Sequence, residues 1–255
     1  MDPWAAGHKL KFETAAITHP GHVRHFNEDS IFADSERGIW LVADGMGGHR
    51  DGNIASAMIA EAAQRIGKGA SLMDLTEAFR RGIGAVNGEL LARSNGQAHR
   101  IVGSTVAALL VHEANYCCLW AGDSRCYLVR DSSIEQLSHD HTEVQELVDR
   151  GVLSQAEAAS WPRRNVVTRA VGAIDDFQME HASGVVRSGD CFVLCSDGLT
   201  GHVNDEEILA RSSKLSANQA SHELLELALA RGGKDNISVV VVNVVDRGAT
   251  TVVMR

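Results

Sequence analysis

Cysteine is scarce in this chain and shows no pairing pattern. The 255 residues include five cysteines, all with apolar neighbours and with no Cys-x-x-Cys pair among them. These features exclude a disulfide framework and disfavour a thiolate zinc site. Cys191 and Cys195, in "DCFVLCSDG", are expected to be small buried hydrophobic residues.

Long hydrophobic runs and excess positive charge are also missing. The N-terminus has no signal-peptide pattern, and the run "VVVVNVV" near the other end is far shorter than a membrane span. We therefore expect a cytoplasmic protein without a membrane partner. The net charge of −9 argues against nucleic acid as a partner, because phosphate backbones need clustered Lys and Arg. It does not exclude phosphorylated substrates, since local cations can override the overall charge.

The order of hydrophobic patterns predicts an α+β fold. An apolar content of 44% suits a globular chain with a sizeable core, and we expect one domain over residues 1–255. Strand patterns do not alternate regularly with helical ones, which favours packed antiparallel sheets with helices outside. We expect strands at 10–18, 30–34, 39–43, within 104–138, and at 179–186, 190–196 and 237–245, and helices around 53–67, 73–94, 205–212 and 217–231. Residues 140–177 break this pattern and are expected to form an inserted flap.

Six carboxylates share one local setting. In "VADGMGGH", Asp44 is expected to end an apolar strand just before a glycine, and Asp197 does the same in "CFVLCSDGL". The other four stand at further predicted strand ends or tight turns: Glu28, Asp29, Asp123 and Asp235. Taken alone, each Asp-Gly is most often a turn. Their recurrence along one chain is the evidence for a common site.

Carboxylates that converge at one edge of a sheet repel one another unless a cation joins them. Hard divalent ions with oxygen ligands are the usual solution, and oxygen-only ligation favours Mg²⁺ or Mn²⁺ over zinc. A glycine after Asp44 lets a backbone carbonyl or a water reach the ion. A pair of such ions roughly 3.5–4 Å apart typically activates water to attack phosphate esters. Arg24, four residues before Glu28, is a candidate to bind the phosphate through its planar fork.

The assembled motifs resemble those of the bacterial PP2C-type metal-dependent protein phosphatases. The motifs stand in the family's order over about residues 10–245: "GHVRHFNEDS", "VADGMGGH", "GSTVAALLV", "WAGDSRCYLVR", "LSHDHT", "FVLCSDGLT" and "GGKDNISVVVV". The resemblance implies a four-layer α-β-β-α sandwich with a flap subdomain. It also implies hydrolysis of phosphoserine and phosphothreonine in proteins by a water activated at a dinuclear Mn²⁺ or Mg²⁺ site, in opposition to a bacterial Ser/Thr kinase. The implied partners are that kinase and its phosphorylated substrates, and we expect a monomer.

The resemblance also assigns roles to single residues. Asp44 matches the ligand that bridges both metals, and Gly45 matches a carbonyl ligand. Asp197 and Asp235 match ligands of the second metal, and Asp123, with Asp197, matches a third, weaker site. Glu28 and Asp29 match the acidic pair near the metals, with Asp29 the better candidate for direct or water-mediated ligation. Arg24 matches the arginine that binds the substrate phosphate.

One position departs from the family pattern. Many eukaryotic members carry a histidine directly after the Asp-Gly pair, proposed as the general acid, where this chain has Met46. We do not transfer that role to His49, so the proton donor to the leaving group stays unassigned.

Three other interpretations stay open from the sequence. In the first, the chain is a binding module that recognises a phosphoprotein without turnover. In the second, the carboxylates hold structural Ca²⁺. In the third, His139-Asp140-His141 belongs to a His-Asp metal site.

Overall fold

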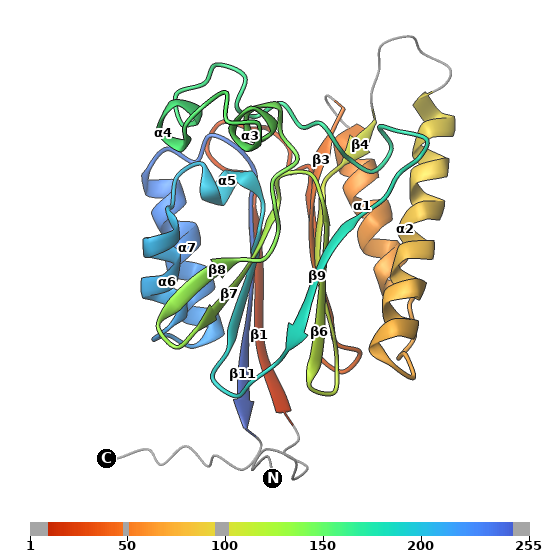
Figure 1. The fold of residues 1–255 in the computed structure, drawn as a ribbon, viewed down its shortest axis with the longest axis vertical. Coiled ribbons are helices and arrows are strands. Elements are labelled where there is room, and N and C mark those ends of the chain that lie inside the picture. Colours follow the sequence, from red (N-terminus) through yellow and green to blue (C-terminus); the bar gives the residue numbers. More distant parts are fainter. Residues whose placement is uncertain (1–9, 48–50, 95–101, 247–255) are drawn as a thin grey trace.

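The computed structural model describes residues 10–47, 51–94 and 102–246. Two antiparallel sheets stack face to face, and helices cover the outer face of each (Figure 1). The predicted four-layer α-β-β-α sandwich is confirmed. The predictions for His49 and for the ends of the chain lie outside the described residues.

The strands divide into two sheets that are discontinuous in sequence. The six-stranded sheet contains, in spatial order, β2 (Asp29–Asp34), β3 (Ile39–Met46), β5 (Val106–His112), β6 (Asn115–Ala121) and β9 (Glu180–Val185), with the short β4 (Gly103–Ser104) paired to β3. The five-stranded sheet contains β1 (Leu10–His19), β11 (Ile237–Asp246), β10 (Cys191–Cys195), β7 (Arg125–Arg130) and β8 (Ser133–Gln136). Hairpins link β2 to β3 and β5 to β6, as local turns allow.

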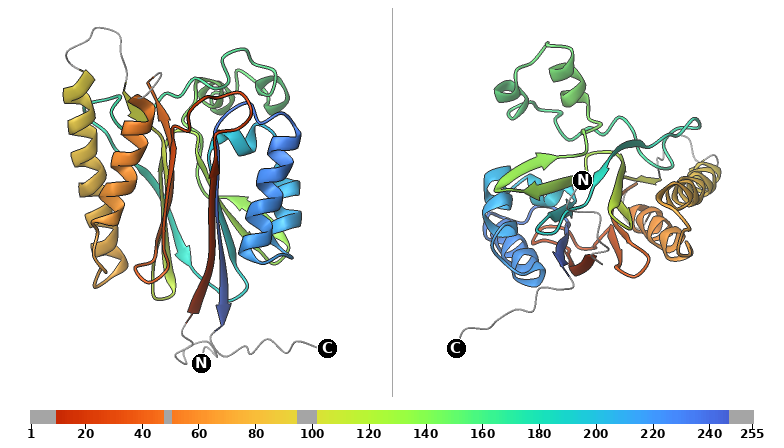
Figure 2. Two further views of the ribbon diagram at one scale, coloured as in Figure 1. Left: turned by 180° about the vertical axis from the view of Figure 1, so that it is seen from behind. Right: turned by 60° about the horizontal axis from the view of Figure 1, so that its bottom comes forward.

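Each sheet has its own helical layer. Helices α1 (Asp51–Gln64) and α2 (Leu72–Ser94) cover the six-stranded sheet, and α6 (Asp205–Ser212) and α7 (Ala217–Ala230) cover the other (Figure 2). The apolar stripe of α2, with Leu75, Phe79 and Ile83, is fully buried against its sheet. Helices α6 and α7 begin with capping boxes at Asn204 and Ser216, which satisfy backbone N–H groups of the first turn.

The strands of the central layers are buried on both faces. One face of β3 packs against α1 and α2 through Leu41, while the other packs between the sheets through Trp40 and Val42. Strand β5 is buried from Val106 to Val111, so it is covered on both sides. All five cysteines are free and buried, and the prediction that Cys191 and Cys195 are buried is confirmed.

Two short elements, β4 and α5, were not expected from the sequence. Strand β4 pairs its Ser104 and Gly103 with Gly45 and Met46, and this pairing extends β3 to Met46. The prediction that Asp44 ends its strand was therefore wrong by two residues. Helix α5 (Asp197–Thr200) starts at Asp197, directly after β10 and Ser196.

Residues 139–178 leave the two sheets and carry two short helices, α3 (Glu143–Asp149) and α4 (Gln155–Ala158). Isolated bridges from Thr142 to Val167 and from Ser104 to Val171 tie this segment to itself and to β4. It lies over one end of the sandwich (Figure 1). No helix in the described part of the chain is long and apolar enough to cross a membrane.

Candidate active site

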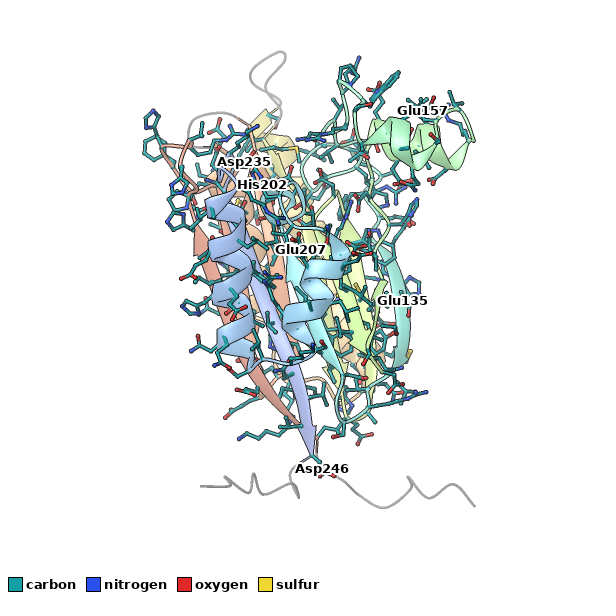
Figure 3. The ribbon with its side chains drawn as sticks, turned by 90° about the vertical axis from the view of Figure 1, so that its left-hand side faces the viewer. Glu135, Glu157, His202, Glu207, Asp235 and Asp246 are labelled. Atoms are coloured by element: carbon teal, nitrogen blue, oxygen red, sulfur yellow. The ribbon has the colours of Figure 1, made fainter. Side chains whose placement is uncertain are left out.

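The predicted acidic residues meet at one end of the sandwich. Strand β11 runs the length of the molecule, so that Asp235 before it and Asp246 at its last residue lie at opposite ends (Figure 3). In the other sheet, Asp29 and Asp44 occupy directly opposed positions of the β2–β3 pair. The negative charges of Asp29, Asp197, Asp123 and Asp235 all act on Asp44.

Asp44 and Asp197 link the two sheets. Their carboxyl groups share a hydrogen bond, although Asp44 belongs to β3 and Asp197 follows β10 of the other sheet. Removal from water, followed by the charge of Asp29 and then that of Asp197, raises the pKa of Asp44 well above its usual range. Burial and the charge of Asp235 likewise raise the pKa of Asp197. Such raised values are typical of carboxylates gathered without enough positive charge around them.

Asp29 presents one held oxygen and one free oxygen. Its Oδ2 accepts hydrogen bonds from Ser196 Oγ at 2.8 Å and Ser238 Oγ at 2.7 Å. Its Oδ1 is buried and has no hydrogen-bond partner. Burial raises the pKa of Asp29 to about 6. This carboxylate is therefore oriented by two hydroxyl groups while one oxygen stays available to a ligand.

Asp123 lies in the turn between β6 and β7 and is buried. Burial and then the negative charge of Asp197 raise the pKa of Asp123 well above its usual range. Asp123 therefore lies close enough to Asp197 for their charges to interact.

The backbones of Glu28 and Gly45 lie close together in the site. The Gly45 N–H donates to the Glu28 carbonyl at 3.1 Å, and Glu28 Oε1 is buried without a hydrogen-bond partner. A Cβ on Gly45 would overlap the Gly52 carbonyl and lie 2.6 Å from the Glu28 carbonyl oxygen. Only glycine fits at position 45, because any side chain would push α1 and the Glu28 backbone away.

Arg24 is the cation of the site. It lies on the loop between β1 and β2, and its Nη2 donates to Asp235 Oδ2 at 2.6 Å. The hydrogen bond to Asp235 raises the pKa of Arg24 above its usual value, and the charges of Glu28 and Asp197 act in the same direction. With about half of its side chain exposed, Arg24 has room to reach a phosphate at the mouth of the cluster.

The supporting hydrogen bonds were not predicted from the sequence. Besides Ser196 and Ser238, they involve Thr105, whose Oγ1 accepts from the Asp44 N–H at 3.0 Å. Asn236 accepts from the Glu28 N–H at 2.8 Å through Oδ1. The available signal was proximity, because Ser196 and Asn236 adjoin the predicted acidic residues Asp197 and Asp235 within the same motifs.

The His139-Asp140-His141 motif has a different role. Asp140 accepts three hydrogen bonds from Arg125, and His139 Nε2 lies 2.8 Å from Asp149 Oδ2. His141 Nε2 lies 3.2 Å from Glu180 Oε1. Because Arg125 takes up Asp140 and each histidine faces a different acidic residue, this arrangement argues against the His-Asp metal site considered from the sequence.

The donor set fits hard divalent cations. Two buried oxygens without partners, Asp29 Oδ1 and Glu28 Oε1, stand beside carboxylates with raised pKa values. A divalent ion favours the charged forms of those carboxylates and supplies the missing partners. Among the described residues, no three Asp, Glu, His or Cys side chains are grouped so that they could hold a metal ion by themselves. The fit is therefore to open sites that also take backbone carbonyls and water.

A cavity of about 320 Å³ adjoins the cluster on the side of residues 139–178. Asp123 and Asp197 form its inner wall. The α3–α4 segment lines the rest of it with polar Gln145, Gln155 and Arg164 and with apolar Val144, Ala158 and Ala159. The cavity places this segment where it would contact a molecule bound at the carboxylates.

A four-layer sandwich with clustered carboxylates where its two sheets meet is the architecture of the metal-dependent phosphatases. The chain belongs to the protein phosphatase 2C family, whose family model matches residues 21–231. It is 36% identical over 241 residues to the serine/threonine protein phosphatase PstP of Mycobacterium tuberculosis, covering 93% of this chain and 46% of that protein. The chain thus spans about half the length of this relative.

Solved structures agree with this assignment. PppA, described as a key regulatory component of T6SS in Pseudomonas aeruginosa, is 37% identical with a TM-score of 0.85, over 92% of this chain and 99% of that one. The catalytic domain of the serine/threonine protein phosphatase PstP in complex with two manganese ions is 34% identical with a TM-score of 0.83, over 93% of this chain and 100% of that one.

Proposed function

We propose that this chain hydrolyses phosphoserine and phosphothreonine in proteins and depends on two Mn²⁺ or Mg²⁺ ions. The observation that carries the proposal is the meeting of Asp44 and Asp197 from different sheets, next to buried oxygens that lack partners. The family, and the manganese in a related structure, support it.

In this proposal, each acidic residue has a position in the metal site. Asp44 would serve both ions because it stands between Asp29 and Asp197, with Gly45 offering its carbonyl. Asp197 and Asp235 would hold the second ion, and Asp123 would complete a third, weaker site with Asp197. Asp29 would act through its free Oδ1, and Glu28 through Oε1. When bound, such ions lower the pKa of water and polarise phosphoryl oxygens.

The chain itself positions the phosphate. Arg24 would donate from its planar guanidinium to phosphoryl oxygens, which gain charge as the phosphoester breaks. Its hydrogen bond to Asp235 holds the guanidinium at the mouth of the cluster. The segment 140–177 would be a flap that contacts the protein around the phosphorylated residue, because α3 and α4 line the adjoining cavity. The opposing kinase, a monomeric state and a cytoplasmic location stay predictions from the sequence.

The test measures hydrolysis of p-nitrophenyl phosphate and of a phosphothreonine peptide after EDTA treatment, with and without added Mn²⁺. The wild-type protein should turn over both substrates only with Mn²⁺, and Asp44→Asn should lose at least a thousandfold in rate, on the order expected when a metal site is lost. Asp131→Asn is the matched control, because Asp131 is exposed at the β7–β8 turn with a φ of 50° that Asn also adopts readily.

The two remaining interpretations predict different results. A phosphoprotein-binding module would bind the phosphopeptide with Mn²⁺ and show no turnover. A structural calcium site would raise the melting temperature with Ca²⁺ and leave both substrates intact. Turnover that is equally fast in EDTA would contradict the proposal.

A further inference from the structure

The loop between β1 and β2, residues 20–28, exposes two large apolar side chains beside Arg24. Val23 is 62% exposed and Phe26 is 57% exposed. A single exposed apolar residue is ordinary in a folded protein. Here two of them fall within four residues and flank Arg24, the candidate phosphate-binding residue, so their exposure calls for an explanation.

One buried side chain, Asn236, is hydrogen-bonded to three backbone groups of this loop. Asn236 Nδ2 donates to the carbonyls of Pro20 at 3.0 Å and Phe26 at 2.9 Å, while its Oδ1 accepts from the Glu28 N–H. Asn236 is only 5% exposed. The backbone on both sides of Arg24 is therefore fixed, and Phe26 is presented to solvent from a defined position.

The first residues of the loop contact the segment just before β11. The His22 N–H donates to the Gly233 carbonyl at 2.7 Å. Gly21 has a φ of 78°, and a Cβ there would overlap the carbonyl oxygen of Asp235. The loop thus sits directly on the residue that also receives the Arg24 hydrogen bond. A shift of the loop would therefore also move Asp235 and Arg24.

The site has two sides. On the flap side, polar Gln145, Gln155 and Arg164 line the cavity together with apolar Val144, Ala158 and Ala159. The loop side offers Val23 and Phe26. The flap faces the viewer in Figure 1, and the β1–β2 loop faces the viewer in the reverse view of Figure 2, so the two lie on opposite sides of the carboxylate end.

We propose that Val23 and Phe26 form a docking surface for apolar side chains that flank the phosphorylated residue of the substrate. This inference rests on the proposed function and names a substrate class: phosphoserine or phosphothreonine with an apolar residue within about two positions. Consecutive Cα atoms are about 3.8 Å apart, so Val23 and Phe26 lie within roughly 8 Å of the Arg24 Cα, about the reach of two residues in an extended peptide.

The substrate is the occupant that the geometry favours. Val23 adjoins Arg24 in sequence, Phe26 is two residues away and both are exposed, so a peptide whose phosphate binds the guanidinium would bring its neighbouring residues close to them. Aromatic side chains that stand exposed on a rigid backbone lose little conformational freedom on binding, which makes them effective contacts. Met73, which is 69% exposed in the first turn of α2 and is neither in the loop nor among the site residues, serves as the control.

The experiment compares two phosphothreonine peptides that differ only in having Leu or Ser at the two positions on each side of the phosphothreonine. The readout is the ratio of their kcat/KM values with Mn²⁺, each scaled to p-nitrophenyl phosphate. The wild-type ratio should favour the Leu peptide by about tenfold, the effect of one good apolar contact. Val23→Ala with Phe26→Ala should bring the ratio near one, and Phe26→Leu should retain most of it. Met73→Ala should leave the ratio unchanged.

A binding measurement tests the same surface without turnover. Fluorescence anisotropy with non-hydrolysable phosphonate versions of the two peptides should show the same preference and the same loss in the double variant. Because both side chains are exposed, the variants should keep the wild-type melting temperature.

Each failure has a distinct meaning. If the wild-type protein turns over neither peptide nor p-nitrophenyl phosphate, the proposed function fails, and the phosphonate peptides still test the surface. If the wild-type protein turns over the substrates but shows no preference for the Leu peptide, the docking surface is refuted. It is also refuted if the double variant keeps the preference. A changed oligomeric state of the double variant with an unchanged ratio would assign the surface to a second copy of the chain and would also refute it.

Discussion

The carboxyl groups of Asp44 and Asp197 share a hydrogen bond across the junction of the two sheets. Asp44 is placed by the pairing of β3 with β2 and β4, and Asp197 is placed by β10 and the first turn of α5. Burial raises the pKa of both groups; the charges of Asp29 and Asp197 add to the rise for Asp44, and the charge of Asp235 adds to it for Asp197. The fold thus places negatively charged groups close together, away from water, which is unfavourable in free energy. Divalent cations bound between the carboxylates can offset this unfavourable free energy.

The metal-free protein should become more stable as the pH falls from 7 to 5. The pKa of Asp29 is raised from 3.8 to about 6, so the folded state binds a proton more tightly than the unfolded state. Stability is therefore lost as the pH rises through this window and recovered on acidification. Asp29 alone should contribute about 1 kcal/mol between pH 7 and pH 5. Urea unfolding in EDTA measures the free energy of unfolding at each pH, and Asp29→Asn should make this free energy depend less steeply on pH. An identical slope in both proteins would contradict the assignment.

Gly45→Ala should disrupt the site. The added Cβ would overlap the Gly52 carbonyl, so α1 and the backbone of Glu28 would have to move. We expect a loss of about 2 kcal/mol or more in unfolding free energy and a loss of Mn²⁺-induced stabilisation. Gly84→Ala is the matched control, because a Cβ on that exposed residue of α2 meets nothing within 4 Å. That change should stabilise the protein by roughly 0.5–1 kcal/mol. Equal effects at the two positions would show that the close packing at Gly45 is unimportant.

Arg24→Ala should mainly weaken binding of the phosphorylated substrate. Loss of a charge-assisted hydrogen bond is worth about 1.5–3 kcal/mol, so KM for the phosphothreonine peptide should rise by roughly ten- to a hundredfold. Arg24→Lys should recover only part of the loss, because an ammonium group lacks the planar fork. Arg81→Ala, whose side chain is 72% exposed and pairs with Glu77, should have no effect on steady-state kinetics. A drop in kcat with KM unchanged would assign Arg24 another role.

Ser238→Ala should weaken metal binding without removing any ligand. The Ser238 hydroxyl donates to Asp29 Oδ2 at 2.7 Å and so fixes the direction of the free Oδ1. Removal of such an orienting partner typically costs ten- to a hundredfold in metal affinity. Isothermal titration with Mn²⁺ measures this loss, and Ser160→Ala, on the exposed α3–α4 segment, is the control. Unchanged affinity in Ser238→Ala would mean that Ser196 alone orients Asp29.

The sequence was most informative where a strand pattern ended in an acidic residue and a glycine. Strand β10 leading to Asp197-Gly198 and strand β11 following Asp235 were predicted from their apolar runs alone. The whole ordered set of motifs then identified the fold, because the register of two sheets cannot be read from hydrophobic periodicity.

The unpredicted features depend on contacts between distant segments. Strand β4 has only two residues and no periodicity, so its pairing with Gly45 and Met46 could not be foreseen. Ser238 reaches Asp29 from 209 positions away, which requires the two sheets to be in place. The tie of Asn236 to the β1–β2 loop has the same origin. Motif residues were visible in the sequence, but the side chains that orient them became visible only in the folded chain.

Anomalous diffraction at the manganese edge, from crystals grown with excess Mn²⁺, tests the central claim most directly. We expect two anomalous peaks roughly 3.5–4 Å apart, with Asp44 in contact with both and Asp197 and Asp235 in contact with one. Crystals that show the three carboxylates with no peak between them would contradict the account.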